Sequence, residues 1–186
     1  MKVKVTPSKV HGNVKIPASK SMAHRALICA SLSDGTSIVS NVTNSKDIEA
    51  TVGCMKALGA IIKQIDETTY EVTGTNLFKQ EGNITCNANE SGSTLRFLIP
   101  LAACTNAKVK FLGQGRLLQR PMDVYANEFK KQNIEFNQSD KEIIVSGNLQ
   151  AKDYVVQGDI SSQFITGFMF VLPLLNQDST LTITKP

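Results

Sequence analysis

The chain has 186 residues, 41% of them hydrophobic and 19% charged, so it can bury a core and is not a disordered tail. Its net charge of +4 comes from scattered lysines and arginines, and aromatic residues make up 6% without any tryptophan, which argues against a nucleic-acid partner. The four cysteines form no CxxC pair and only two histidines accompany them, so we expect no metal site.

The sequence predicts a cytoplasmic protein with no membrane partner. The longest mostly apolar run, residues 164–175, contains Pro173 and is shorter than the roughly twenty residues that a bilayer span needs. The first residues alternate Val with Lys, unlike a signal peptide. Three of the four cysteines have Ala, Leu or Met neighbours, which favours buried free thiols in a reducing compartment.

The first predicted unit runs from a helix to a pair of short strands. The helix covers residues 22–31 and follows the polar stretch Ser19-Lys20-Ser21, with Ser19 as its cap. A strand at 34–39 comes next, and a second helix then runs from Lys46 to a C-terminal cap at Gly59. The unit closes with strands at 60–65 and 69–73, followed by Gly74.

The same pattern returns twice, with an offset of about 72 residues between corresponding segments. The second unit is predicted to have a helix at 94–103 after Ser91-Gly92-Ser93, a strand at 106–111, a helix at 122–131 with Pro121 at its first position, and strands at 134–137 and 142–146 before Gly147. The third has a helix at 164–172 after Ser161-Ser162-Gln163 and a strand at 178–183.

These repeats predict an α/β fold, a pseudo-threefold domain of β-α-β-α-β-β units whose first helices are buried and parallel. We place the domain at residues 13–186 and its units at 13–82, 83–152 and 153–186. The third unit lacks its second helix and its two closing strands. Because the apolar faces that await these elements would stay exposed, we expect the chain to be part of a longer protein.

The starts of the three first helices predict an anion site. Around a threefold axis their N-termini meet, and each N-terminus carries partial positive charge. Lys20 opposes the helix dipole unless an anion lies beside it, Arg25 follows one turn later, and Arg120 precedes the second helix of the second unit. The pattern therefore predicts a pocket for one or two phosphorylated or carboxylated small molecules.

Other polar residues near these helices have simpler interpretations. We expect His24 to pack between helices, Asp47 and Glu49 to stabilise a helix start, and Arg96 to form a structural ion pair. The apolar stripe at 164–172 is interpreted as core.

Four motifs resemble the EPSP synthase family. The stretch Pro17-Ala-Ser-Lys-Ser-Met-Ala-His-Arg-Ala26 resembles the family's first signature, and Glu90-Ser-Gly-Ser-Thr-Leu-Arg96 resembles the second, which usually has Asn in place of Glu90. Arg120-Pro121-Met122 and Ser161-Ser162-Gln163-Phe164 match two further family segments in order and spacing. Together the motifs span most of the chain.

The resemblance implies the enolpyruvyl transferase fold and the transfer of the enolpyruvyl group of phosphoenolpyruvate to the 5-hydroxyl of shikimate 3-phosphate, with release of phosphate and without metal or cofactor. It implies that shikimate 3-phosphate binds to Lys20, Ser21, Arg25, Ser161, Ser162 and Gln163, and phosphoenolpyruvate to Lys20, Gly92, Arg120 and Gln163. The family's proton-handling aspartate belongs to a second domain later in the chain, and residues 1–12 belong to that domain or to its hinge. The resemblance therefore implies no catalytic residue here, a C-terminal domain as partner, and no activity for this part alone.

Two alternatives stay open. The sister enzyme UDP-N-acetylglucosamine enolpyruvyl transferase shares the fold but carries a reactive cysteine in the loop before the Arg-Pro junction, and residues 113–119 contain none. It also lacks the Ser-Lys-Ser-x-x-His-Arg stretch. The other alternative is a non-catalytic module that binds an anionic metabolite, which would bind simple phosphates about as well as shikimate 3-phosphate.

Overall fold

The computed structural model describes residues 2–9, 11–14 and 16–185. Its first unit contains α1 (Lys20–Leu32), β1 (Thr36–Val39), α2 (Lys46–Ala57), β2 (Ile61–Gln64) and β3 (Tyr70–Thr73). After a short turn of 3-10 helix at Leu77–Lys79, the second contains β4 (Glu81–Asn87), α3 (Gly92–Ala102), β5 (Asn106–Leu112), a 3-10 turn at Leu117–Gln119, α4 (Asp123–Lys130), β6 (Glu135–Gln138) and β7 (Ile143–Ser146). The third contains β8 (Asp153–Gln157), α5 (Ser162–Val171), a 3-10 turn at Leu172–Leu174 and β9 (Thr180–Thr184).

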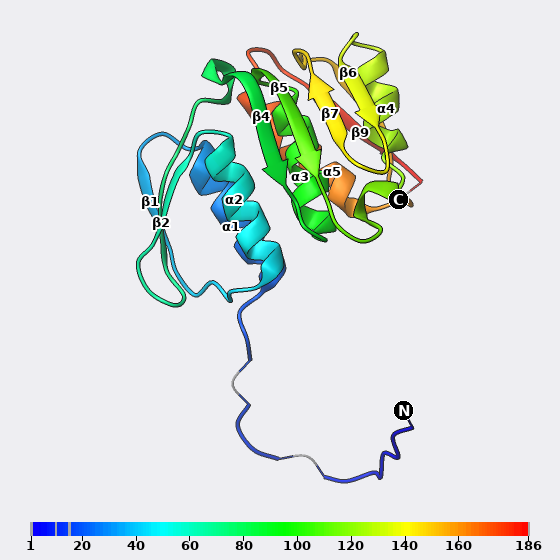
Figure 1. Cartoon of the computed structure of the whole chain (residues 1–186). Coiled ribbons are helices and arrows are strands. Elements are labelled where there is room, and N and C mark those ends of the chain that lie inside the picture. Colours follow the sequence, from blue (N-terminus) through cyan, green and yellow to red (C-terminus); the bar gives the residue numbers. More distant parts are fainter. Residues whose placement is uncertain (1, 10, 15, 186) are drawn as a thin grey trace.

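The sheets repeat one topology, which confirms the predicted repeat (Figure 1). In the first unit β1 pairs antiparallel with β3, and β3 with β2. The second unit has the same arrangement of β5, β7 and β6, and β4 adds a parallel strand beside β5. In the third unit β8 and β9 pair in parallel as β4 and β5 do. The sheet of the second unit thus has all four strands of the pattern. The first unit has three of them and the third unit has two.

The first helix of each unit begins at a serine cap. The hydroxyl oxygens of Ser19, Ser91 and Ser161 accept hydrogen bonds from the backbone N–H groups of Met22, Thr94 and Gln163, respectively. These bonds satisfy N–H groups that have no partner within a helix. The predicted end of α2 is also confirmed, since Gly59 follows it with φ +101°, a conformation that glycine adopts without steric cost.

The core centres on α3, which is buried along most of its length. Pro100 lies inside α3 and has no N–H to offer the Arg96 carbonyl one turn earlier. The Tyr125 hydroxyl on α4 replaces that donor, at 2.6 Å from the Arg96 carbonyl oxygen. Gly167 lets α5 approach this contact, because a Cβ there would lie 2.1 Å from the Tyr125 hydroxyl and 2.7 Å from the Arg96 carbonyl oxygen. The backbone carbonyl of Arg96 on α3 is therefore the point where α4 and α5 both pack against α3.

Two local expectations were wrong. Pro121 precedes α4 by two residues instead of opening it. Cys29 is exposed, although its neighbours in sequence are apolar, because it lies on the α1 face that also exposes Met22. Cys54, Cys86 and Cys104 are buried and free. The first unit has no leading strand among the described residues 2–9, 11–14 and 16–18, and the outer edge of β1 has no partner strand among the described residues.

The described residues before α1, which are 2–9, 11–14 and 16–19, extend away from the body of the molecule (Figure 1). The segment assigned to a second domain or hinge, residues 1–12, includes Met1 and Val10, which lie outside the described residues. No helix among the residues that the structure describes combines the length and the apolar character needed to cross a membrane.

Candidate functional site

The first turns of α1 and α5 are joined by Arg25. One guanidinium nitrogen donates to the Ser21 carbonyl at 2.9 Å, and the other donates to the Thr166 hydroxyl on α5 at 3.3 Å. The Thr166 hydroxyl in turn donates to the Ser162 carbonyl at 3.1 Å. The Arg25 guanidinium also lies 5.3 Å from the centre of the Phe97 ring on α3, which favours a cation–π interaction. Arg25 thus touches all three units.

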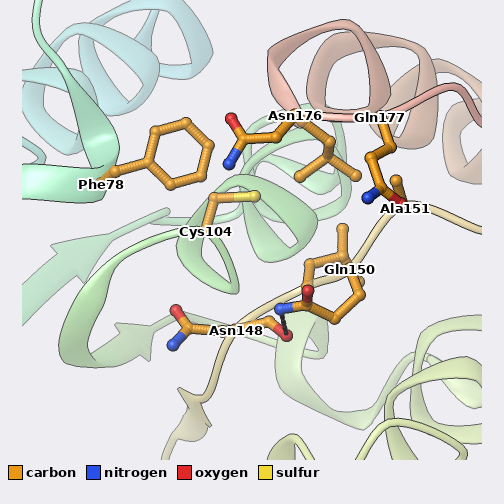
Figure 2. Close-up of a pocket in the computed structure, with 9 residues that line it drawn as sticks. Phe78, Cys104, Asn148, Gln150, Ala151, Asn176 and Gln177 are labelled. Carbon is orange, nitrogen blue, oxygen red and sulfur yellow. Dashed lines mark hydrogen bonds between the residues drawn. The ribbon is translucent and has the colours of Figure 1, made fainter.

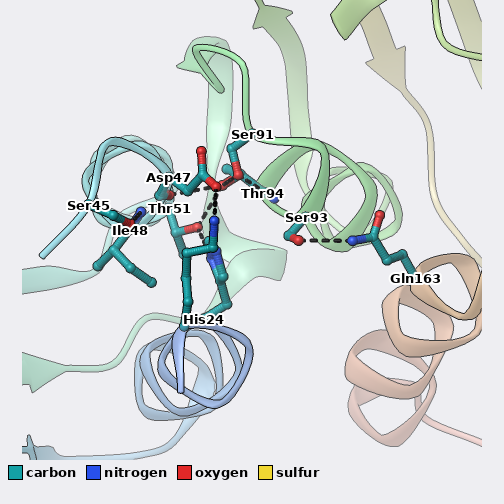
Figure 3. A network of polar contacts seen from close by, with 10 residues as sticks. His24, Ser45, Asp47, Ile48, Thr51, Ser91, Ser93, Thr94 and Gln163 are labelled. Carbon is teal, nitrogen blue, oxygen red and sulfur yellow. Dashed lines mark hydrogen bonds and ion pairs between the residues drawn. The ribbon is translucent and has the colours of Figure 1, made fainter. Parts of the chain in front are cut away.

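The first turns of α3 and α5 are joined by Gln163 (Figure 3). Its side-chain amide nitrogen donates to the Ser93 hydroxyl at 2.9 Å, and its amide oxygen accepts from Arg96 at 2.8 Å. The starts of α1, α3 and α5 therefore lie at one end of the molecule, as the repeat predicts. Ser21, Ser93 and Ser162 belong to this end.

Lys20 has a carboxylate partner within the chain. Its ammonium donates to the Asp47 carboxylate on α2 at 2.6 Å, and both groups are partly exposed. Asp47 and Glu49 lie in the first turn of α2, as expected, where their negative charge favours the helix start. The sequence did not indicate that the Asp47 carboxylate also binds Lys20. An exposed ion pair contributes only about 0–1 kcal/mol, so an incoming anion can compete for Lys20.

The guanidinium of Arg120 lies close to the backbone of Gly92. A Cβ built on Gly92 would lie 2.5 Å from one guanidinium nitrogen of Arg120 and 3.6 Å from one of Arg96. Beside them is a hollow of about 330 Å³ lined by Arg116, Gln119, Arg120 and Pro121. Gly92 thus leaves room for two arginines at the start of α3.

Three arginines at this end have no carboxylate partner among the described residues. Among residues 2–9, 11–14 and 16–185, none of Arg25, Arg96 and Arg120 forms an ion pair, so the structural ion pair expected for Arg96 was wrong. Burial, and then the charge of Arg120, lower the pKa of Arg96. The Arg96 Nε is buried without a hydrogen-bond partner. Such an arrangement favours bound anions.

Sequence reasoning missed Arg96, although its position one turn after Gly92 was a usable signal. Residues four apart share a helix face, so an arginine there can reach the ligand side of the helix start. The partners Asp47 and Thr166 gave no comparable signal, since both come from segments distant in sequence. His24 was placed correctly between helices and is 1% exposed.

A second pocket, of about 270 Å³, lies beyond the C-terminal end of α3 beside Cys104 (Figure 2). Its lining includes Phe78, Asn148 and Gln177 and contains no charged side chain among the described residues. Burial raises the pKa of the Cys104 thiol to about 12, so the thiol is not ionised near neutral pH. Among its described lining residues, this pocket therefore offers no positive charge to balance an anion.

Comparison with known proteins shows the family of the chain. A sequence model of the family described as EPSP synthase (3-phosphoshikimate 1-carboxyvinyltransferase) matches residues 5–186. The chain belongs to the EPSP synthase family. Among its relatives, the 3-phosphoshikimate 1-carboxyvinyltransferase of Clostridium perfringens (strain SM101) is 47% identical over 185 residues, and that of Clostridioides difficile (strain 630) is 46% identical over 195.

The chain spans 43–44% of the length of these EPSP synthase relatives and is itself covered to 98%. A solved structure of EPSP synthase from Acinetobacter baumannii superposes with a TM-score of 0.78 at 18% identity, over 94% of this chain and 41% of that one. The predicted α/β fold, a part of the enolpyruvyl transferase fold, is thereby confirmed.

Proposed function

We propose that this chain forms the wall of a 3-phosphoshikimate 1-carboxyvinyltransferase that binds shikimate 3-phosphate and one side of phosphoenolpyruvate. The observation that carries the proposal is the meeting of Arg25, Arg96 and Arg120 with the N-terminal turns of three helices. Two anionic substrates balance that charge. Charge-assisted hydrogen bonds contribute about 1.5–3 kcal/mol each, so a handful of them can position both molecules.

Shikimate 3-phosphate is proposed to lie across α1 and α5. Its ligands are Lys20, Ser21, Arg25, Ser161, Ser162 and Gln163. Ser21 and Ser162 are exposed, and Arg25 links their helices, so an anion can meet both helix starts at once. The Lys20 ammonium would then contact both the Asp47 carboxylate and the substrate.

Phosphoenolpyruvate is proposed to lie at the start of α3. Its ligands are Lys20, Gly92, Arg120 and Gln163. We place Gln163 between the two substrates because it belongs to α5, beside shikimate 3-phosphate, and contacts Ser93 and Arg96 on α3. The contact of Gly92 with Arg120 supports this assignment. Arg96 joins the positive surface around the same helix start.

The chemistry follows from charge and position. The chain holds both anions close enough for the 5-hydroxyl of shikimate 3-phosphate to add to the enolpyruvyl carbon, after which phosphate leaves. The proposal includes no metal and no cofactor. Proton transfer and closure over the substrates belong to a second domain of the full-length protein, so this chain alone is expected to bind and not to turn over. A cytoplasmic location is part of the proposal, and cell fractionation tests it.

Calorimetry on the chain tests the binding role. Shikimate 3-phosphate is expected to bind with a Kd of roughly high-micromolar to millimolar, because the open site stays hydrated. Inorganic phosphate should bind at least about tenfold more weakly, since it cannot reach both α1 and α5. Equal affinity for the two would support a generic anion-binding module, and a preference for UDP-N-acetylglucosamine would support the sister enzyme.

A matched pair of lysine variants checks the position of the site. Lys20 opens α1 and Lys46 opens α2, and both are exposed. Lys20→Ala should abolish measurable binding of shikimate 3-phosphate, while Lys46→Ala, which changes the net charge equally, should leave it nearly unchanged. Equal losses in the two variants would mean that only the overall charge attracts the ligand.

A further inference from the structure

A buried chain of hydrogen bonds joins the starts of α1 and α3 beneath the anion site (Figure 3). Nδ1 of His24 lies 2.7 Å from the Thr51 hydroxyl on α2, and that hydroxyl lies 2.7 Å from the Thr94 hydroxyl on α3. The Thr94 hydroxyl continues to the Ser91 hydroxyl at 2.7 Å. All four side chains are at most 2% exposed. Neutral hydrogen bonds of this kind, shielded from water, hold their partners in one arrangement.

The protons of this chain run in one direction. The Asp47 carbonyl oxygen, which can only accept, lies 3.3 Å from the Thr94 hydroxyl, so Thr94 donates toward Asp47 and Ser91. Thr51 must then donate to Thr94, because the Thr94 proton is already used. We infer that His24 in turn donates from Nδ1 to Thr51, which leaves its Nε2 unprotonated. This tautomer fits the position of Nε2, which is buried without a hydrogen-bond partner.

That direction suits an anion site. Each donor in the chain points its proton toward Ser91, so the bond dipoles add with their positive end at the start of α3. Ser91 uses its oxygen to accept from the Thr94 hydroxyl and backbone N–H. Burial lowers the pKa of His24 to about 4, with Asp47 opposing this and Lys20 and Arg25 adding to it, so the imidazole is neutral near pH 7.

We propose that the chain His24–Thr51–Thr94–Ser91 is a positioning device that holds the start of α3 in register with the Lys20–Asp47 pair. Thr94 is its central residue, because its one hydroxyl contacts Thr51, Ser91 and the Asp47 carbonyl. Through Ser91 it fixes the helix start from which Ser93 binds Gln163, and through Asp47 it fixes the partner of Lys20. The inference rests on the proposed function, in which Lys20 and Gln163 hold shikimate 3-phosphate.

Paired variants of Thr94 in the 186-residue chain separate positioning from stability. Thr94→Val keeps the volume and removes the hydroxyl, and it should raise the Kd for shikimate 3-phosphate roughly two- to tenfold, the worth of about one neutral hydrogen bond. Thr94→Ser restores the hydroxyl and should return the Kd to within about twofold of wild type. Thr51→Val is a second variant that breaks the chain one step further from the site.

Thr105 gives a matched control at the other end of α3. It is 1% exposed, and its hydroxyl donates to the Ala102 carbonyl at 2.8 Å. Thr105→Val should lower the unfolding temperature about as much as Thr94→Val and leave the Kd unchanged. An unchanged Kd in Thr94→Val, or an equal rise in Thr105→Val, would overturn the positioning role.

The tautomer of His24 can be measured without ligand and tests the direction of the hydrogen-bond chain. Nitrogen-15 NMR of the wild-type chain should show Nδ1 protonated and Nε2 unprotonated near pH 7, and an Nε2–H tautomer would overturn the direction of the chain. If the wild type shows the expected tautomer but binds no shikimate 3-phosphate, the proposed function fails and the positioning role with it. If the wild type binds shikimate 3-phosphate as expected and Thr94→Val has the same Kd, the positioning role is refuted and the proposed function stands.

Discussion

The buried imidazole of His24 predicts a specific loss of stability in acid. Burial lowers its pKa in the folded chain from the ordinary value of 6.5 to about 4. Between these values the unfolded chain takes up a proton at His24 that the folded chain does not, so falling pH favours unfolding. Each pKa unit corresponds to about 1.4 kcal/mol, so the full difference amounts to about 3 kcal/mol. This contribution is complete above pH 6.5 and is lost as the pH falls to 4.

The assay is urea unfolding at several pH values for wild type and for His24→Asn. Carboxylates titrate in the same range, so the quantity of interest is the difference between the two curves. The variant is expected to be less stable at pH 7.5 and to close most of that gap by pH 4. His11→Asn removes an exposed histidine and serves as the control. Parallel curves for wild type and His24→Asn would refute the reasoning, because His24 would then carry the same charge in both states.

Three further predictions concern the packing and ligand side of α3. Gly167→Ala should lower the free energy of unfolding by about 3 kcal/mol in urea titrations, since its Cβ would overlap the Tyr125 hydroxyl and the Arg96 backbone. A cost below about 0.5 kcal/mol would show that α5 can shift to make room. Tyr125→Phe should cost about 1–2 kcal/mol in the same assay, because the Arg96 carbonyl, already without a helix donor at Pro100, loses its partner; no loss would mean that another donor takes over. Gly92→Ala should change stability by less than about 0.5 kcal/mol, since the flexible Arg120 can move, yet raise the KM for phosphoenolpyruvate in the full-length enzyme; a large loss of stability with unchanged kinetics would make Gly92 structural.

The repeat and the meeting of the three helix starts could be predicted from sequence because their signals lie in short, recurring segments. A serine cap, an apolar helix and an alternating strand recur at nearly constant spacing, and this recurrence alone places the starts of α1, α3 and α5 together. Gly59 marked the end of α2 for the same reason. The leading strands β4 and β8 were implied by the repeat, but their sequences gave no clear boundary.

What the sequence could not provide were contacts between distant segments. The Lys20–Asp47 pair joins residues 27 apart, and the Arg25–Thr166 bond joins residues 141 apart. A helix pattern alone gave Asp47 a role at its own helix start, and only the packing of α2 against α1 brings its carboxylate to Lys20. Cys29 was misplaced because apolar neighbours in sequence do not report which face of a helix is covered.

The central claim is that the starts of α1, α3 and α5 form one anion site. Amide chemical shifts during titration of the chain with shikimate 3-phosphate test it most directly. The account predicts that the amides of Ser21, Ser93 and Ser162 shift together along one binding curve, and that Arg25→Ala abolishes all three changes. Shifts that appear instead around the second pocket, at Asn148 and Gln177, or that survive in Arg25→Ala, would contradict the claim.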